Sequence, residues 1–223
     1  MGHKGATLGY RKIQNLDQDR VWMDYMRAPL FDDACKRVYG AGTAISSFRC
    51  MFFNKPARRP GSAIGGTTLP WHQDRWRHLT ADPLLTVYSA LDDATAETGC
   101  VFVVPGSHKL GVQNPEHHSG FLTDEQVAAA CGEEKQAQLE LRAGDVALLH
   151  NWTIHKSGTN STDNSRRAYS VNYMPATTQA YCHEYEIGKN EKVDLKQGGQ
   201  EMGKGSALSE GGLYFPVIFP REE

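Results

Sequence analysis

Between Ser46 and Pro175 the chain consists of short β-rich runs separated by turns rich in glycine, proline and asparagine. Leu84 to Leu91 and Ala168 to Met174 are two of the clearer runs. Short strands at this spacing, with turn residues between them, are typical of a β-sandwich or a β-barrel. The pattern therefore predicts an all-β core.

The first forty-five residues have a helical pattern instead. Apolar residues recur there at roughly helical spacing, and a second short helix is expected at Phe31 to Val38, after Pro29. The residues with the helical spacing are Ile13, Leu16, Val21, Trp22, Tyr25 and Met26. We expect these helices to buttress the outside of the sheet, so the class is an all-β core with flanking helices (α+β).

One pair of polar residues, His72 and Asp74, has the spacing of metal ligands. On an extended strand, side chains two residues apart project to the same face. A third ligand is available at His155, which follows the apolar run Val146 to Leu149 and its polar end. Two neutral nitrogens and one carboxylate on one face of an octahedron leave three positions open, which suits iron(II) that must also hold a co-substrate and O2. A His-x-Asp pair also arises by chance in a chain with 9 histidines, so the pair alone is weak evidence.

An arginine follows the third candidate ligand and is a candidate for binding a co-substrate. Arg166 lies eleven residues after His155 and opens the run Ala168 to Met174. A guanidinium on the strand beside the third ligand would clamp a dicarboxylate through two parallel hydrogen bonds, which lysine does less well. Because adjacent strand residues point to opposite faces, only one of Arg166 and Arg167 is expected to enter the interior.

Several blocks in this order resemble the phytanoyl-CoA dioxygenase family of Fe(II)/2-oxoglutarate oxygenases. The resemblance runs from about Phe48 to Pro175. The blocks are Phe53-Asn54-Lys55-Pro56, His72-Gln73-Asp74, Asp82-Pro83, the stretch Glu97 to His108, and His155-x-Ser157 followed by Arg166. The resemblance implies a double-stranded β-helix, also called a jelly roll, with a cupin-like metal site inside one end.

The resemblance also implies roles for particular residues. It assigns His72, Asp74 and His155 to iron(II), and Arg166 with Ser157 to the distal carboxylate of 2-oxoglutarate. These three iron ligands are also the expected catalytic residues. The carboxylate at Asp74 indicates a hydroxylase-type site, because related halogenases replace this acid with a small residue and bind chloride there.

Two further positions, Met51 and Tyr88, fall where the family packs side chains beside the co-substrate, although both are equally explained as core residues. The implied activity is the oxidation by O2 of an unactivated C–H bond in a small metabolite or natural-product intermediate, with release of succinate and CO2. Two alternatives remain open. A non-oxidative jelly-roll metalloenzyme of the isomerase type would not need Arg166 and Ser157, and a non-catalytic metabolite-binding module should have lost a ligand.

The whole chain, residues 1–223, is expected to form a single domain. We expect a helical buttress in residues 1–45, the jelly-roll core in residues 46–175 and a loop-rich segment in residues 176–223. Within the core, Thr123 and Gln126 form the capping box of a helix that reaches about Ala130 and that is expected to line or shield the cavity mouth. The glycine-rich stretch from Gly188 to Gly212 is either a surface loop or lid, or disordered.

Composition limits the kinds of binding partner and the cellular compartment that we expect for this protein. A net charge of −2 and a pI near 6.5 give no general attraction to nucleic acid, and no apolar run approaches the length of a membrane span. The 5 cysteines are scattered, which favours a reducing cytoplasm. The expected partner is a small-molecule substrate, and the sequence leaves the oligomeric state open.

The substrate itself is less constrained than the cofactors. A set of polar and aromatic residues beside the motifs is expected near the opening: Arg75, Trp76, Arg77, His78, His150, Asn151 and Trp152. Arg75 and Arg77 either bind an anionic or polar substrate or are simply solvated. His108, His117 and His118 have no carboxylate at matching spacing, so no metal is expected there.

Overall fold

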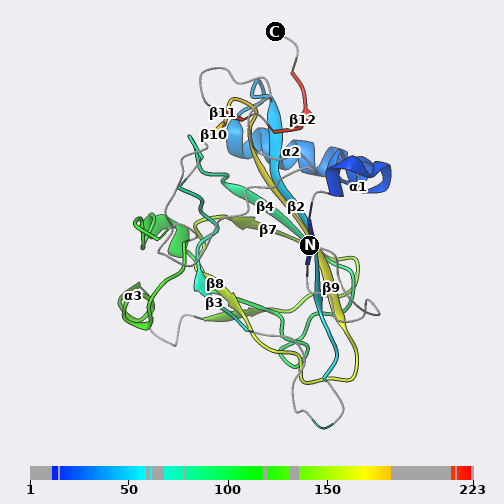
Figure 1. Ribbon diagram of the computed structural model, residues 1–223, viewed down its shortest axis with the longest axis vertical. Coiled ribbons are helices and arrows are strands. Elements are labelled where there is room, and N and C mark those ends of the chain that lie inside the picture. The colour runs from blue at the N-terminus through cyan, green and yellow to red at the C-terminus, as the bar shows by residue number, and fades with distance from the viewer. Residues whose placement is uncertain are drawn as a thin grey trace.

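The protein is described by a computed structural model that covers residues 12–14, 16–58, 61, 68–77, 79–117, 120–130, 136–181, 212–213 and 215–221 (Figure 1). Almost all of the glycine-rich stretch from Gly188 to Gly212 lies outside these residues, as do His78 and His118. Among the described helices, none is both long and apolar enough to cross a membrane.

The described strands form two main antiparallel sheets that face each other across the interior (Figure 1). The large sheet has the order β1 (Lys12–Gln14), β2 (Ile45–Lys55), β9 (Arg166–Pro175), β4 (Leu85–Ala90) and β7 (Val146–His150), with β12 (Val217–Phe219) also paired to β2. The small sheet has the order β3 (Leu69–His72), β8 (His155–Ser157), β5 (Val101–Val103) and β6 (Ala137–Leu139). A separate pair joins β10 (Ala180–Tyr181) to β11 (Gly212–Leu213).

Beyond β2 the chain passes repeatedly between the two main sheets: β3, β5, β6 and β8 belong to the small sheet, whereas β4, β7 and β9 belong to the large one. This alternation closes the two sheets into a double-stranded β-helix. The predicted jelly roll is therefore confirmed. It matters for function because residues far apart in sequence, on β3 and β8, become neighbours at one end of the fold.

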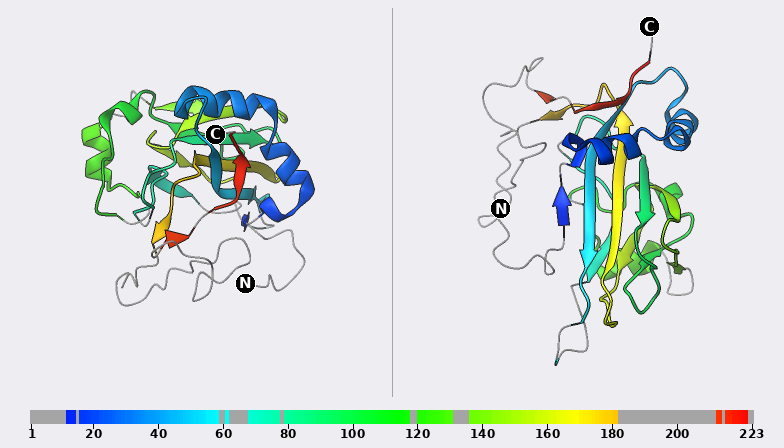
Figure 2. Two further views of the ribbon diagram at one scale, coloured as in Figure 1. Left: turned by 90° about the horizontal axis from the view of Figure 1, so that it is seen from above. Right: turned by 90° about the vertical axis from the view of Figure 1, so that its right-hand side faces the viewer.

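The central strands of the large sheet, β2, β9 and β4, are largely buried on both faces because two helices cover their outer side. In α1 (Arg20–Met26) the N-cap Asp19 accepts a hydrogen bond from the Val21 N–H at 2.9 Å, and α2 (Pro29–Tyr39) begins with proline. Figure 2 shows both helices against this sheet. Their apolar residues pack into one cluster with the outward side chains of the strands, including Met26, Phe31, Cys35, Ile45, Val87, Val171 and Tyr173.

The N-terminal prediction was wrong at one point. Ile13, which we placed in the helical repeat, lies in β1, where it pairs with Phe52 of β2. Leu16 opens a single 3-10 turn, η2 (Leu16–Gln18), before α1 begins. Backbone pairing with the exposed edge of β2 therefore outweighs the local apolar spacing here, a common tertiary override of short-range pattern.

The helix α3 (Asp124–Ala130) begins with the predicted capping box. The Thr123 N–H donates to Gln126 Oε1 at 2.9 Å, and the Gln126 N–H donates back to Thr123 Oγ1 at 3.2 Å. The helix does not shield the cavity mouth, however. Val127 packs against Trp71 and Ile154 on the outer face of the small sheet, and no residue of α3 is among the cavity-lining residues described below.

The strand β7 is less buried than the apolar run Val146 to Leu149 predicts. It lies at the edge of the large sheet, and Leu148 is 51% exposed. An edge strand with one solvated face alternates in burial, so its apolar sequence does not imply that both faces are covered.

Candidate active site

Two histidines meet at the small sheet because their strands are hydrogen-bonded neighbours. His72 of β3 and His155 of β8 are directly opposed in the antiparallel register, and their ring centroids lie 4.0 Å apart. Opposed residues in such a pair project to the same face of the sheet. Here that face is the interior of the jelly roll.

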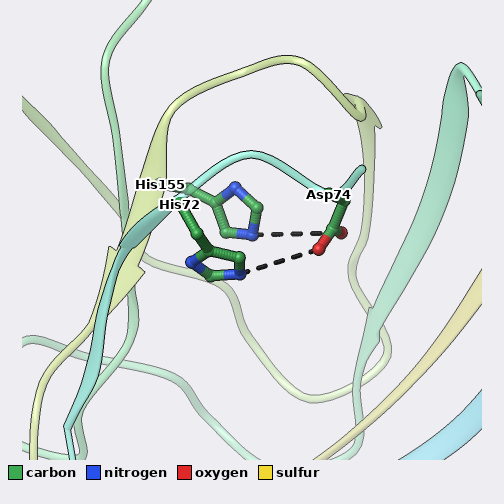
Figure 3. A group of neighbouring side chains, drawn as sticks. All are labelled: His72, Asp74 and His155. Atoms are coloured by element: carbon green, nitrogen blue, oxygen red, sulfur yellow. Dashed lines mark ion pairs between the residues drawn. The ribbon is translucent and has the colours of Figure 1, made fainter. Parts of the chain in front are cut away.

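Asp74 reaches the histidines from a loop rather than from the strand. β3 ends at His72, and the Asp74 N–H donates to the backbone carbonyl of Asn151 at 2.8 Å. The carboxylate Oδ1 lies 3.6 Å from His72 Nε2, and Oδ2 lies 3.9 Å from His155 Nε2 (Figure 3). The same-strand argument for His72 and Asp74 is therefore corrected: a loop tied to Asn151 places the carboxylate.

Asn151 in turn fastens this loop to the large sheet. Its side chain is buried and accepts a hydrogen bond from Thr86 Oγ1 at 2.7 Å, and its N–H donates to the carbonyl of Leu84 at 3.1 Å. Sequence reasoning placed Asn151 at the cavity opening. The structure instead makes it the link through which the large sheet positions Asp74.

Gln73, between the two candidate ligands, points away from them and anchors their loop. Its amide nitrogen donates to the carbonyls of Gly111 at 2.9 Å and Trp152 at 2.7 Å, and its amide oxygen accepts from the Gln113 N–H at 2.8 Å. The side chain is fully buried, at 0% exposure. A buried amide with three partners fixes the loop on either side of it, so Gln73 contributes to the geometry of Asp74.

Both histidines present the same nitrogen to Asp74. The Nδ1 atoms contact backbone carbonyls at 2.9 Å, Pro70 for His72 and Thr153 for His155. A carbonyl only accepts, so Nδ1 carries the proton and the Nε2 lone pair is left for a metal. Burial, reinforced by neighbouring His155, lowers the pKa of His72 to about 4, which keeps this ring neutral as a ligand must be.

This pKa shift predicts a pH dependence for the metal-free protein. The ordinary pKa of a histidine is 6.5, whereas that of His72 in the folded protein is about 4. Between these two pH values the unfolded chain binds a proton at His72 that the folded chain does not bind. The free energy of unfolding should therefore fall as the pH falls through this window, by a total of roughly 3 kcal/mol. Urea unfolding of the chelator-treated protein at several pH values measures how the free energy of unfolding changes with pH. His72→Gln should flatten this dependence, and an equal slope in both proteins would contradict the prediction.

The three side chains fit one metal ion. One atom from each of His72, Asp74 and His155 lies within 4.8 Å of the others, and Figure 3 shows all three converging on one point. Two imidazole nitrogens and one carboxylate are the donor set of non-haem iron(II) sites with open positions. No other group of this kind is found among the described residues.

Arg166 lies inside the same cavity, at the start of β9. It is 3% exposed, and its two terminal nitrogens donate to Tyr88 Oη at 2.6 Å and to the Gly99 carbonyl at 2.7 Å. The Nε atom is buried without a hydrogen-bond partner, which leaves a charged donor available to a ligand. Arg167 points outward, as strand alternation predicts, and forms an ion pair with Asp92 at 2.7 Å.

Gly99, near the start of the block Glu97 to His108, occupies a position where the backbone requires glycine. A Cβ atom at this position would lie 2.7 Å from the carbonyl oxygens of Gly158 and Thr159, and its φ is +77°. Only glycine avoids both problems. This close approach brings the Gly99 carbonyl to Arg166, while the Lys55 ammonium donates to the Gly158 carbonyl.

The remaining predicted site residues also line the cavity, whose volume is about 520 Å³. Met51 and Tyr88 line it from the large sheet and Ser157 from the small sheet. Tyr88 also accepts the Arg166 hydrogen bond, and burial raises the pKa of its hydroxyl, so it remains a neutral donor. The assignment of Met51, Tyr88, Ser157 and Arg166 to a co-substrate stays a prediction.

Most residues expected at the opening have other roles. Arg75 donates to the Pro115 carbonyl, and Arg77 donates to the Glu116 carbonyl at 2.9 Å, so both are committed to the surface of the protein. Of the described members of that set, Trp76 alone lines the cavity. The rings of His108 and His150 stack on each other 4.9 Å apart, away from the cavity-lining residues.

Sequence reasoning missed Arg49, which lines the cavity from β2. The signal was a single charged residue inside the otherwise uncharged run Ile45 to Phe53. A buried strand position tolerates such a charge only where a ligand or a partner compensates it.

A jelly roll that holds two histidines and one carboxylate on a shared interior face defines the class of mononuclear non-haem metal sites. The sequence profile of phytanoyl-CoA dioxygenase (PhyH) matches residues 7–168. The chain belongs to the phytanoyl-CoA dioxygenase family.

Relatives and solved structures agree with this placement. The chain is 29% identical over 184 residues to a probable phytanoyl-CoA dioxygenase of Caenorhabditis elegans, covering 77% of this chain and 55% of that protein. It is 27% identical over 193 residues to the human peroxisomal phytanoyl-CoA dioxygenase, covering 83% and 54%. The chain thus spans about half the length of these curated relatives.

The fold is shared with more distant enzymes. The epimerase SnoN, solved with Fe3+, alpha ketoglutarate and nogalamycin RO, aligns with a TM-score of 0.69 at 22% identity, covering 93% of this chain and 77% of that one. EctD from S. alaskensis, solved with 2-oxoglutarate and 5-hydroxyectoine, aligns with a TM-score of 0.61 at 18% identity, covering 76% and 58%.

Proposed function

We propose that this protein is an Fe(II)- and 2-oxoglutarate-dependent dioxygenase that oxidises a C–H bond of a small metabolite or natural-product intermediate. The observation that carries the proposal is that one cavity holds both a facial His72, Asp74 and His155 set and a buried arginine with an unpartnered donor, Arg166. The metal set alone would also suit other metalloenzymes. The arginine adds a site for a carboxylate.

The two sheets would contribute different parts of the site. The small sheet and its loop supply His72, Asp74 and His155, which would hold iron(II), and the large sheet supplies Arg166. Buried and held by Tyr88 and Gly99, Arg166 is oriented before any ligand arrives, so little side-chain entropy is lost on binding a carboxylate. The chemistry that bound iron(II) and 2-oxoglutarate supply is oxidation by O2 with release of succinate and CO2.

The cavity favours a small substrate. Its volume of about 520 Å³ must accommodate 2-oxoglutarate as well as the reacting part of the substrate. The curated relatives are named for a CoA thioester, whereas the structural neighbours SnoN and EctD were solved with nogalamycin RO and 5-hydroxyectoine. SnoN is an epimerase, so outcomes other than hydroxylation are within the range of this fold.

The experiment that tests this function is anaerobic. Adding Fe(II) and then 2-oxoglutarate should produce a weak visible charge-transfer band, because the keto acid chelates the metal. A non-oxidative metalloenzyme or a binding module predicts no such band. A metabolite library is then screened for compounds that stimulate succinate release in air. The absence of the band with iron bound would reject the proposed function.

A further inference from the structure

We propose that Arg49 binds an anionic group, a carboxylate, on the primary substrate, and that the protein therefore acts on small organic acids. This inference rests on the proposed function and names the substrate class for the same cavity. It is carried by the position of Arg49, by the absence of a compensating partner, and by the charge balance of the cavity.

Arg49 lies on the wall opposite the histidines. It projects from β2 into the cavity, as do Met51, Phe53 and Lys55 at alternate positions along the strand. Its guanidinium carbon lies 5.0 Å from the ring centroids of both Phe48 and Trp76. The ring centroids themselves lie 4.6 Å apart, so the two rings pack beside each other next to the guanidinium. A ring face offers no conventional hydrogen-bond acceptor, so the N–H groups remain available to a ligand.

The guanidinium of Arg49 has no hydrogen-bonded or ion-paired partner among the described residues. Its Nε atom is buried and donates no hydrogen bond, and none of the ion pairs among the described residues includes it. Burial lowers the pKa of this guanidinium, and the field of Asp74 opposes the shift only in part. A buried donor without a partner is unfavourable in the free protein and is accounted for if a ligand supplies the acceptor.

The charges of the cavity point to an anion. Asp74 is the one acidic side chain among its described lining residues. In the loaded site, the charges of iron(II), Asp74, the 2-oxoglutarate dianion and Arg166 would cancel. The other basic residues that line the cavity are Arg49, Lys12, Lys55 and Lys156, so the lining keeps an excess of positive charge. A carboxylate of the substrate would neutralise Arg49, whose charge is the one buried beside Phe48 and Trp76.

A 2-oxoglutarate molecule bound at Arg166 would not reach Arg49. Along the paired strands, Arg166 is opposite Lys55, whereas Arg49 is opposite Asn172. Six residues of extended strand separate these two levels, roughly 20 Å along β2. Arg166 is also held by Tyr88 and Gly99 at its own end. A five-carbon dicarboxylate bound to Arg166 therefore leaves the Arg49 end of the cavity for another molecule.

The test compares small carboxylic acids with their primary amides. Each acid and amide pair is titrated into the anaerobic protein loaded with Fe(II) and 2-oxoglutarate, and binding is followed by the fluorescence of the tryptophans, of which Trp76 contacts Arg49. We expect the wild type to favour at least some acids over their amides. Arg49→Gln should lose that preference, with acid affinity falling by about tenfold or more and amide affinity unchanged.

Arg49→Lys is the matched control, because it keeps the charge but not the planar fork, and it should retain part of the acid preference. The melting temperature of metal-free Arg49→Gln should not be lower than that of the wild type, since a buried unpartnered charge is removed. This measurement also shows that any loss of acid binding does not come from unfolding of the variant.

Three outcomes would overturn the inference: a wild type with no preference for acids, an Arg49→Gln variant that keeps the preference, or one that weakens 2-oxoglutarate binding instead. The last result would assign Arg49 to the co-substrate. The charge-transfer band separates these outcomes from failure of the proposed function. If the band forms and acids are not preferred, only the role of Arg49 is wrong.

Discussion

Replacing His155 with alanine should reduce 2-oxoglutarate turnover to background while the protein stays folded. The loss of one of three ligands should weaken iron binding by more than the roughly 10–100-fold that follows loss of a residue behind a ligand. The fold should survive because His155 lies at the short strand β8 and faces a cavity that water can fill. Iron content, the anaerobic band and succinate release measure the three consequences separately, and circular dichroism checks the fold.

A matched control is His108→Ala. This histidine stacks on His150 outside the cavity-lining residues, so its removal should leave iron content and turnover near the wild-type values. His72→Ala should reproduce the defect of His155→Ala. Wild-type iron content and turnover in either ligand variant would show that the metal set has been chosen wrongly.

The approach of His72 to His155 could be predicted from sequence because it depends on strand pairing. His72 ends the short strand β3 and His155 begins the short strand β8, and a jelly roll brings such strands together in antiparallel register. The outward direction of Arg167 and the inward direction of Arg166 follow from the same alternation. These features depend only on the period of a strand, which sequence pattern reveals well.

What sequence did not reveal depends on loops and on long-range pairing. Asp74 owes its position to a hydrogen bond with Asn151, 77 residues later, and to the anchoring of Gln73. No local pattern encodes such contacts. Ile13 joined a strand edge against its local spacing, and Arg49 could be recognised as an interior cation only once β2 was seen to line the cavity.

The division between sheets has a consequence for substrate entry and orientation. The candidate metal ligands belong to the small sheet and its loop, whereas both interior arginines belong to the large sheet. A molecule held at one end by metal and at the other by Arg166 would span the two sheets. Small changes in the distance between the sheets would then alter its orientation relative to the metal.

The second large effect should distinguish Arg166 from Arg167. Arg166→Gln removes a buried cation whose Nε has no other partner, and loss of a charge-assisted contact to a buried carboxylate should weaken binding by about 2–5 kcal/mol. The 2-oxoglutarate concentration needed for half-maximal formation of the anaerobic band should therefore rise by about thirtyfold or more. Arg166→Lys should recover only part of this, because an ammonium cannot reproduce the planar fork that now spans Tyr88 and Gly99.

Arg167→Gln tests the register of the strand with the same chemical change one residue away. Arg167 is paired with Asp92 near the surface, with 53% of its side chain exposed, so its loss should change stability slightly and 2-oxoglutarate binding hardly at all. Titrating the co-substrate into both variants under anaerobic conditions decides between them. If Arg167→Gln carries the large defect and Arg166→Gln binds normally, β9 is out of register by one residue. Ser157, which shares the interior face with Arg166, would then have to be reassigned with it, because the two were placed at the co-substrate by the same alignment of strands.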